Sequence, residues 1–465
     1  MDGPDPAAPA GLAPGAGLDR ATRPRHVAGL LRLAVPLAVA QLSQTAMGVT
    51  DTVLLGRLGG DALAVGGLAT NLFFVPVLVL QGVLTSASVL VAHAQGAGRP
   101  ERIPGLYRSG LVLALLLSLP AFALMGFAEP ILLALGEPPA LARDTGRYLG
   151  VLRWGAPAAL VGVGLMRALL PALGQGRWLL GAALLGAVAN GVLGWGLIRG
   201  AWGLPVLGPI GPAAATVAVL WAMAAGLLAT LHLRPGVRHH VAPGRPSVRV
   251  MAEMLRLGLP VGATVGVETG LFTATGLLAG LLGPASLAAH QVALNVAVTA
   301  FMVPLAIGQA ANVQVGRWAG AGRRREARRA GFTALALGGA FTAATGALLL
   351  AAPGTIAGLY LDPARPETAE VAALAASLLG VAGMFQVADG VQAVAAGALR
   401  GLKDTAVPML VAAGGYWGVG FPVAYAAAFT LGWGAVGLWW GLATGLAAVA
   451  VLLTWRFHAR SRAGA

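Results

Sequence analysis

The sequence predicts an all-α polytopic membrane protein, with twelve transmembrane helices in two parallel six-helix repeats, an N-lobe and a C-lobe, around a central cleft. Three observations lead to this fold class. Of the 465 residues, 57% are hydrophobic and only 10% are charged, whereas soluble globular chains carry about 25% charged residues. The apolar residues gather in twelve long segments, and the second half of the chain repeats short stretches of the first.

Each segment has the roughly 20 mostly apolar residues that a helix needs to cross the hydrocarbon core. Several segments are longer, which predicts tilted helices or helix ends that protrude from the bilayer. In chain order we expect spans at about residues 30–56, 62–94, 105–127, 146–172, 178–199, 211–233, 255–282, 286–316, 331–353, 369–399, 405–430 and 434–456.

The basic residues predict the orientation of these spans, because cytoplasmic loops are enriched in Arg and Lys. When both termini and the even-numbered loops are placed in the cytoplasm, that side receives 24 of the 31 basic residues. The opposite loops are acidic: Glu129, Glu137 and Asp144 in the third, and Asp362, Glu367 and Glu370 in the ninth. We therefore expect cytoplasmic termini. The net charge of +14 follows from this topology and needs no nucleic-acid partner.

An internal repeat with an offset of 224 residues divides the chain into two halves. LRLAVP at 31–36 returns as LRLGLP at 255–260, and GAGR at 96–99 returns at 320–323. Leu63-Ala64 returns as Leu287-Ala288 at the same offset. Six spans, an even number, separate the copies, so both halves enter the membrane in the same direction, and an axis along the membrane normal relates them. Two such halves suit alternating access.

The repeat and the spans together predict the domain organisation. Residues 1–26 lack an apolar core and are interpreted as a disordered cytoplasmic tail, since they are rich in Pro, Ala and Gly. The predicted domains that follow are the N-lobe (27–235), a cytoplasmic linker (236–254), the C-lobe (255–457) and a cytoplasmic tail (458–465).

Three carboxylates lie inside predicted spans: Asp51, Glu268 and Asp389. A charged group at the centre of a membrane helix costs about 2.5–3.5 kcal/mol on the insertion scale. No Lys lies in any span, and Arg153 and Arg167 are the only deep Arg candidates. The carboxylates therefore either hold protons or hold a cation. For Asp51, which lies closer to a helix end, capping or snorkelling at the interface is the alternative.

Polar side chains accompany these carboxylates, although each of them alone is more typical of a hydrogen bond between packed helices than of a site. Met47 and Phe385 are candidates for lining a substrate cavity, with plain packing as the alternative, and His290 is a candidate proton shuttle or a structural histidine. The supporting polar candidates are Gln44 and Asn190 in the N-lobe, and Thr264, Gln291, Asn295, Thr299, Gln386 and Gln392 in the C-lobe.

The sequence offers no sign of an enzyme. Cysteine is absent, which excludes disulfides and zinc-thiolate sites. A Walker A loop requires G-x-x-x-x-G-K-[ST], but the only lysine is Lys403 and Leu402 precedes it. We expect no catalytic residues and no cofactor. The energy source that remains is an ion gradient, which supplies about 2.3 kcal/mol per charge and 100 mV.

Five stretches resemble the multidrug and toxic compound extrusion (MATE) family, most closely its NorM-like bacterial branch, over about residues 27–455. Two are in the first half, MGVTDTVLLGRLG in span 1 and VAHAQGAGR after span 2. Three are in the second half: VGVETGLF, AAHQVALNVAVTAFMVPLAIGQAANVQVGRWAGAG and DGVQAVAAGALRGLKDT. The last two are long and distinctive.

The resemblance implies a secondary active antiporter that exports amphipathic, often cationic, drugs or metabolites in exchange for H⁺ or Na⁺. It implies that Asp51 is the carboxylate of the first lobe, linked to protonation and substrate release, with Asn190 as its amide. It implies that Glu268 and Asp389 are the pair of the second lobe that binds the cation, with Na⁺ as a candidate. Gly194 stands where the family usually has a polar residue, so the sequence leaves open whether the first-lobe ion site is complete.

The family also implies a monomer in the bacterial inner membrane, with small-molecule substrates and the lipid bilayer as its partners. The alternative is a lipid-linked oligosaccharide flippase of the same superfamily, which predicts an Arg-rich cavity, whereas this sequence has at most two deep basic residues. A third class, a scaffold or receptor without transport, has no need of carboxylates at mid-membrane depth.

Overall fold

The computed structural model describes residues 23–361 and 366–462. Within this part of the chain, twelve helical stretches are long and apolar enough to cross a membrane, and each of the twelve predicted spans coincides with one of them. The stretches are His26–Gly56, Gly60–Gly96, Pro100–Gly126, Pro139–Ala172, Gly176–Arg199, Gly208–Leu233, Val248–Leu281, Pro284–Gly320, Arg324–Ala351, Thr368–Gly401, Ala406–Thr430 and Gly434–Arg462. The predicted all-α polytopic fold class is confirmed.

The first half of the chain forms ten α-helices. These are α1 (Arg23–Gly56), α2 (Gly60–Leu84), α3 (Ser86–Gly96), α4 (Ile103–Gly126), α5 (Ala128–Ala134), α6 (Pro139–Leu152), α7 (Ala156–Ala158), α8 (Arg167–Ala172), α9 (Gly176–Arg199) and α10 (Gly211–Leu233). The second half forms α11 (Val248–Leu281), α12 (Pro284–Gly320), α13 (Arg324–Ala351), α14 (Pro353–Gly358), α15 (Pro366–Gly401), α16 (Ala406–Ala413), α17 (Phe421–Tyr425) and α18 (Gly434–Arg462).

Short 3₁₀ turns and π-helical segments complete the described chain. The 3₁₀ turns are Pro100–Arg102, Arg153–Gly155, Ala201–Gly203, Gly208–Ile210 and Arg238–Val241. The π-helical segments are Ala159–Met166 in the fourth span, and Gly414–Gly420 and Ala426–Thr430 in the eleventh. The segment GGYWGVG is rich in glycine, which favours the α-helix poorly, so the local sequence permits this departure. The sequence alone predicted continuous helices here.

Several helices extend beyond the apolar runs that predicted them. Residues 23–26 of the predicted N-terminal tail belong to α1, and residues 248–254 of the predicted linker belong to α11. Helix α18 continues to Arg462, into the predicted C-terminal tail. Hydropathy detects only the part of a helix that matches the hydrocarbon core, whereas the polar turns at its ends continue into the interface. Residues 1–22 and 463–465 of the predicted tails, and Asp362 of the ninth loop, lie outside the described residues.

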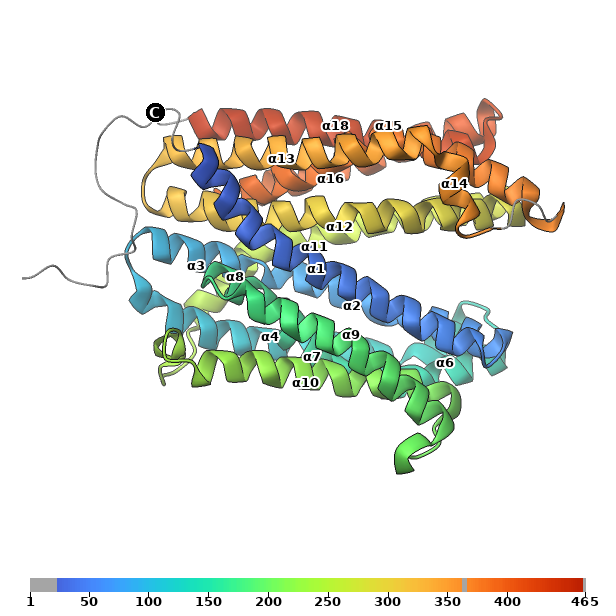
Figure 1. The fold of residues 1–465 in the computed structure, drawn as a ribbon, viewed down its shortest axis with the longest axis horizontal. Helices are drawn as coiled ribbons and strands as arrows, with labels where there is room; N and C mark the ends of the chain where they lie inside the picture. Colours follow the sequence, from blue (N-terminus) through green and yellow to red (C-terminus); the bar gives the residue numbers. More distant parts are fainter. Residues whose placement is uncertain (1–22, 362–365, 463–465) are drawn as a thin grey trace, which may run out of the picture.

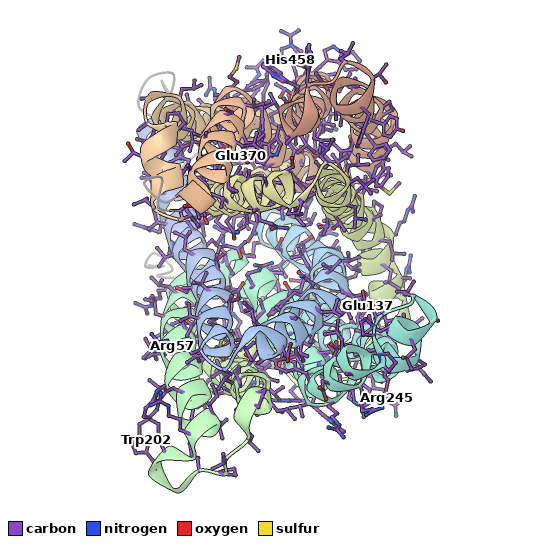
Figure 2. All side chains as sticks on the ribbon, turned by 90° about the vertical axis from the view of Figure 1, so that its right-hand side faces the viewer. Arg57, Glu137, Trp202, Arg245, Glu370 and His458 are labelled. Atoms are coloured by element: carbon purple, nitrogen blue, oxygen red, sulfur yellow. The ribbon has the colours of Figure 1, made fainter. Side chains whose placement is uncertain are left out.

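The two halves of the chain form two lobes. In Figure 1 the N-lobe (α1–α10, blue to green) forms the lower layer, and the C-lobe (α11–α18, yellow to red) forms the upper layer, with α1 crossing from one to the other. Figure 2 views the opposite end of the molecule from that of the described C-terminus, and places Glu370 on the C-lobe and Arg57, Glu137 and Trp202 on the N-lobe.

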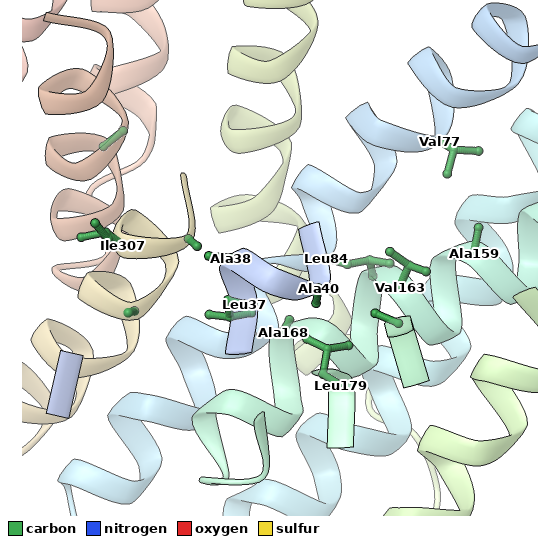
Figure 3. Packing of buried hydrophobic residues seen from close by; sticks show 14 of the residues in the cluster. Leu37, Ala38, Ala40, Val77, Leu84, Ala159, Val163, Ala168, Leu179 and Ile307 are labelled. Carbon is green, nitrogen blue, oxygen red and sulfur yellow. The ribbon is translucent and has the colours of Figure 1, made fainter. Parts of the chain in front are cut away.

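The lobes meet along small residues whose backbones approach closely, as expected for helices in lipid. Helix α1 packs against α12 of the C-lobe as well as against α9 of its own lobe, and Leu37, Ala38 and Ala40 of α1 belong to the buried apolar cluster that Figure 3 shows together with Ile307 of α12. Gly262 of α11 faces α2, where an added Cβ would lie 2.7 Å from the carbonyl oxygen of Val79. The close packing at Gly262 leaves no room for a side chain while the lobes are together.

The contacts between the lobes obey the predicted internal symmetry. Gly96 of α3 packs against the backbone of Arg317 in α12, and Gly320 of α12 packs against the backbone of His93 in α3. Residues 96 and 320 are 224 apart, and so are residues 93 and 317. One contact is therefore the symmetry mate of the other, which is the signature of a two-fold interface. The axis relates two parallel repeats.

Candidate functional site

Asp51 lies in a triangle of hydrogen bonds built by three helices of the N-lobe. The side-chain amide of Asn190 in α9 donates to Asp51 Oδ1 at 2.7 Å. Thr216 Oγ1 in α10 lies 3.0 Å from Asp51 Oδ2 and 3.0 Å from Asn190 Oδ1. Asn190 and Thr216 are buried. The predicted partnership of Asp51 with Asn190 is present, and Thr216 is a member that the sequence did not indicate.

A count of donors and acceptors in this triangle shows what it can hold. The hydroxyl of Thr216 has one proton but faces two acceptors. With Asp51 ionised, only one of these two contacts is a hydrogen bond. With one proton on Asp51 Oδ2, that proton is donated to Thr216, and Thr216 donates to Asn190. All three contacts are then satisfied in a closed ring, so the geometry accommodates one exchangeable proton.

The other N-lobe candidates form no hydrogen bond with this triangle among the described residues. Gln41 in α1 accepts a hydrogen bond from Arg167 Nη1 at 2.7 Å, which engages one of the two deep arginines. Gln44 is half-buried, and no hydrogen bond within the described residues joins it to Asp51. Met47 is buried in the core of the lobe. A Cβ on Gly194 would lie 3.0 Å from Leu54, so the position that is usually polar in the family is packed against an apolar side chain.

The C-lobe brings Glu268 of α11 towards Asp389 and Gln392 of α15. Gln392 Nε2 donates to Glu268 Oε1 at 3.4 Å. Asp389 is 5% exposed, and its charge interacts with that of Glu268. Tyr416, in the π-helical segment of the eleventh span, is fully buried within range of both charges. The predicted pair of carboxylates therefore shares one polar region, to which Tyr416 adds a hydroxyl.

Several buried oxygen and nitrogen atoms of the C-lobe lack a hydrogen-bond partner in the part of the protein that the structure describes. Asp389 Oδ1, the Tyr416 hydroxyl and both amide atoms of Gln386 have no hydrogen bond among the described residues. Buried polar groups are usually paired, so such a concentration needs an explanation. Carboxylate, amide and hydroxyl oxygens are hard ligands suited to a small cation. In the part of the chain described here, no three His, Cys, Asp or Glu side chains lie close enough together to hold a metal ion.

The predicted polar stripe of span 8 bonds along its own helix. Asn295 Nδ2 donates to the backbone oxygen of Gln291 at 2.9 Å, and Thr299 Oγ1 donates to that of Asn295 at 2.8 Å. The side chains of the stripe are exposed, and no hydrogen bond between described residues joins them to Glu268 or Asp389. Thr264 likewise bonds the carbonyl of Pro260, at 2.8 Å.

His290 and Phe385 belong to a buried aromatic cluster of the C-lobe. Trp439 Nε1, which can only donate, bonds His290 Nδ1 at 3.2 Å, so the proton of a neutral His290 lies on Nε2. Phe385 packs against Trp439 with ring centroids 5.9 Å apart and is 4% exposed. Both residues lie in the interior of the lobe in this conformation.

Arginine partners do not neutralise the three carboxylates. Among ion pairs between described residues, none includes Asp51, Glu268 or Asp389. The guanidinium of Arg153 lies over the ring of Phe122, 4.7 Å from its centroid. Arg400, at the end of α15, lies close enough to Glu268 for their charges to attract each other, but the two groups form no ion pair. The acidic groups thus remain available to a proton or a cation.

Two parallel six-helix lobes, with carboxylates inside their spans that form no ion pair among the described residues, define a two-lobed transport protein of the membrane. Comparison with known proteins identifies the family. The MatE family model matches residues 36–195 and 260–426. The chain belongs to the MATE family, and within it to the NorM-like branch.

Relatives and solved structures agree with this assignment. A Burkholderia mallei protein named probable multidrug resistance protein NorM is 58% identical over 98% of this chain and 97% of its own length. A Pseudomonas aeruginosa protein of the same name is 40% identical, over 92% and 88% respectively. The crystal structure of the eukaryotic MATE transporter AtDTX14 has a similar fold, with a TM-score of 0.83 at 23% identity over 95% of this chain and 98% of that one. A MATE protein in a bent conformation gives a TM-score of 0.85 at 18% identity, over 95% and 96%.

Proposed function

We propose that this protein is a secondary active multidrug efflux antiporter, which exchanges H⁺ or Na⁺ for amphipathic, often cationic, drugs or metabolites by alternating access. The observation that carries the proposal is the set of three carboxylates inside the spans, Asp51, Glu268 and Asp389, none of which forms an ion pair among the described residues. The names of the relatives, which specify multidrug resistance, support the substrate class. The expected location is the bacterial inner membrane, as a monomer with both termini in the cytoplasm.

The two lobes offer two different places for the coupling ion. In the N-lobe, the ring of Asp51, Asn190 and Thr216 is complete when one proton is present. In the C-lobe, the carboxylates of Glu268 and Asp389 and the hydroxyl of Tyr416 are oxygen ligands of the kind that Na⁺ takes. Neutralising the carboxylates removes the attraction for a cationic drug, so ion entry from outside drives drug release there.

The conformation described here supports an assignment within the transport cycle. The lobes touch through Ser88 with Asn312 and Gln95 with Arg317, close to the arginine-rich ends of their helices. If those ends are cytoplasmic, as the distribution of basic residues predicts, the lobes are closed towards the cytoplasm. Return to the opposite conformation requires these contacts to separate. The gradient is the proposed source of energy, with no enzymatic step and no cofactor.

The flippase alternative finds no support in the deep basic residues. A pyrophosphate-linked substrate favours several arginines in the central region. Arg167 is engaged with Gln41, Arg153 is engaged with an aromatic ring, and Arg400 is attracted to the charge of Glu268. The antiporter is therefore the function that the geometry supports best.

Dye efflux from cells that express the protein tests the proposal. We expect the Asp389→Asn variant to lose most of the efflux of a fluorescent cationic dye, because the amide cannot exchange a proton or attract a cation. Asp144→Asn is the matched control, since Asp144 is exposed and pairs only with Arg147 at 3.6 Å. Membrane insertion of each variant is verified by surface labelling. Equal efflux by wild type and Asp389→Asn would remove the coupling role.

A further inference from the structure

A cavity of about 200 Å³ lies at the seam between the lobes, away from the carboxylates. Its N-lobe wall consists of α3, the turn after it and the start of α4. Its C-lobe wall is formed by Ala319, Gly320 and Lys403. By the same measure a single water needs roughly 10–15 Å³, so the cavity has room for a multi-atom group. It lies near the arginine-rich helix ends, at the depth where lipid headgroups are expected.

The charges around the cavity are predominantly positive. Arg99, Arg102 and Lys403 line it. Glu253 is the acidic partner of two of them, at 3.6 Å from Arg102 and 3.3 Å from Lys403. The guanidinium of Arg99 has no hydrogen-bond or ion-pair partner among the described residues. The three positive side chains outnumber the single carboxylate of Glu253, so the cavity has a net positive charge that attracts an anion.

The backbone at Lys403 supports a specialised role. Lys403 is the only lysine of the chain, and its φ of 61° lies in the left-handed region that lysine rarely adopts. Such backbone conformations carry a cost of about 1–3 kcal/mol and cluster at binding sites. The turn that requires this conformation positions the ammonium group at the cavity.

The internal repeat explains why the cavity exists on one side of the two-fold axis. Position 94, which lines the cavity, is alanine, whereas its repeat equivalent at position 318 is tryptophan. Arg323, the equivalent of Arg99, lies over the Trp318 ring, 5.8 Å from its centroid, and His26 packs edge-on against the same ring. The tryptophan thus supplies the partner of Arg323. In the first repeat, the small Ala94 leaves Arg99 without a ring and the space open.

We infer that this cavity binds a phosphate-type oxyanion, either a free phosphate or the headgroup of an anionic phospholipid. Arginine guanidinium groups bind phosphate oxygens in paired hydrogen bonds, and lysine adds a point charge. Basic pockets between membrane helices on the cytoplasmic side are typical headgroup sites. Because both lobes supply walls, the site exists only while the lobes are together. A bound anion therefore stabilises that conformation.

Binding of the anion does not depend on the proposed antiport. An effect of the bound anion on transport does rest on that proposed function. Purified full-length protein in phosphate-free detergent is titrated with inorganic phosphate, with chloride at matched ionic strength as the reference, and thermal unfolding is followed. In a second arm, native mass spectrometry counts the phospholipids retained from phosphatidylcholine nanodiscs with and without phosphatidylglycerol.

Two variants and one control make the test specific. Ala94→Trp copies the filled side of the repeat, and Arg99→Gln removes an exposed, unpaired cation with little effect on folding. Arg57→Gln, at the other end of the molecule (Figure 2), is the control. We expect both variants to weaken binding about tenfold or more, as for the loss of a charged hydrogen bond, and the control to bind like wild type.

The outcomes distinguish the two sources of the anion. Stabilisation by inorganic phosphate without retained phosphatidylglycerol supports a free anion, and retained phosphatidylglycerol without a phosphate effect supports a headgroup. Binding that is unchanged in both Ala94→Trp and Arg99→Gln would overturn the site, as would the absence of binding in both arms. Because binding is measured without a gradient, its failure is distinguishable from failure of transport.

Discussion

Ser88 and Asn312 lie 224 residues apart, which is the offset of the internal repeat, and the amide of Asn312 donates to the hydroxyl of Ser88 at 2.7 Å. Two residues at equivalent positions touch each other only if the symmetry axis passes between them. This hydrogen bond therefore marks the axis about which the lobes are arranged. Movement of the lobes in alternating access must separate Ser88 from Asn312.

A disulfide across the axis is expected to stop transport. The chain contains no cysteine, so the double variant Ser88→Cys/Asn312→Cys has a single pair of thiols. We expect oxidation to lock the lobes together and abolish efflux, and a reductant to restore it. Each single variant, treated identically, is the control. Undiminished transport by fully cross-linked protein would show that the lobes do not part at this point.

Removal of the Thr216 hydroxyl is expected to impair coupling in the N-lobe. In Thr216→Val, Asp51 Oδ2 and Asn190 Oδ1 lose their common partner, at a cost of about 1–3 kcal/mol for a buried unsatisfied group. We expect proton-driven uptake to fall about tenfold or more, and Thr216→Ser to restore most of it.

The matched control for this prediction lies on the same helix. Thr230 is also in α10, but its hydroxyl bonds only the carbonyl of Gly226, at 2.9 Å. Thr230→Val should transport like wild type. Normal transport by Thr216→Val would mean that the triangle serves packing alone.

Tyr416→Phe is expected to separate ion binding from stability. The hydroxyl of Tyr416 is buried and has at most a weak contact with Gln392, so its removal should change the melting temperature little. The concentration of coupling ion required for half-maximal transport should rise about 2- to 12-fold, the equivalent of one hydrogen bond.

Exposed Tyr425, in the same span, provides Tyr425→Phe as the control. A lower melting temperature for Tyr416→Phe with unchanged ion dependence would instead assign the hydroxyl a structural role.

His240 predicts a pH dependence of stability in the loop between the lobes. Burial, and secondarily the charge of neighbouring His239, lower the pKa of His240 from 6.5 to about 4. The unfolded chain then binds more protons than the folded protein between these pH values, so stability is complete above about pH 6.5 and falls as the pH drops towards 4. The full linkage value of about 3.4 kcal/mol is an upper limit, and the loss is smaller because solvent screens the half-buried imidazole.

Thermal unfolding followed by tryptophan fluorescence checks this prediction. His240→Gln should flatten the pH profile between pH 6.5 and 4, because the side chain no longer titrates. An identical profile for wild type and variant would assign the acid sensitivity to other groups.

The sequence predicted the features that carry strong physical signals. Long apolar runs located the twelve spans, and the repeat predicted that the two halves are parallel. Both signals extend over many residues, so no single residue decides them. Asp51, Glu268 and Asp389 stood out since a charge in lipid is costly. Asn190 was also indicated, as an amide in the middle of a span.

The partners of the carboxylates were harder to predict, for a physical reason. Thr216 is one of many threonines in the spans, most of which bond their own helix, as Thr264 does. Only the packing of α10 against α1 and α9 separates Thr216 from the others. Tyr416 lies in a π-helical segment, where the wider turn changes which residues share a face. The stripe at Gln291 and Asn295 had the spacing of a site, yet helix rotation leaves it exposed.

The most direct test of the central claim is drug uptake into proteoliposomes under separately imposed pH and sodium gradients, with wild type, Asp51→Asn and Asp389→Asn compared. The account predicts gradient-dependent uptake by wild type, and its loss in at least one of the two variants while drug binding persists. Uptake by both variants at the wild-type rate under every gradient would contradict the role of the buried carboxylates in coupling.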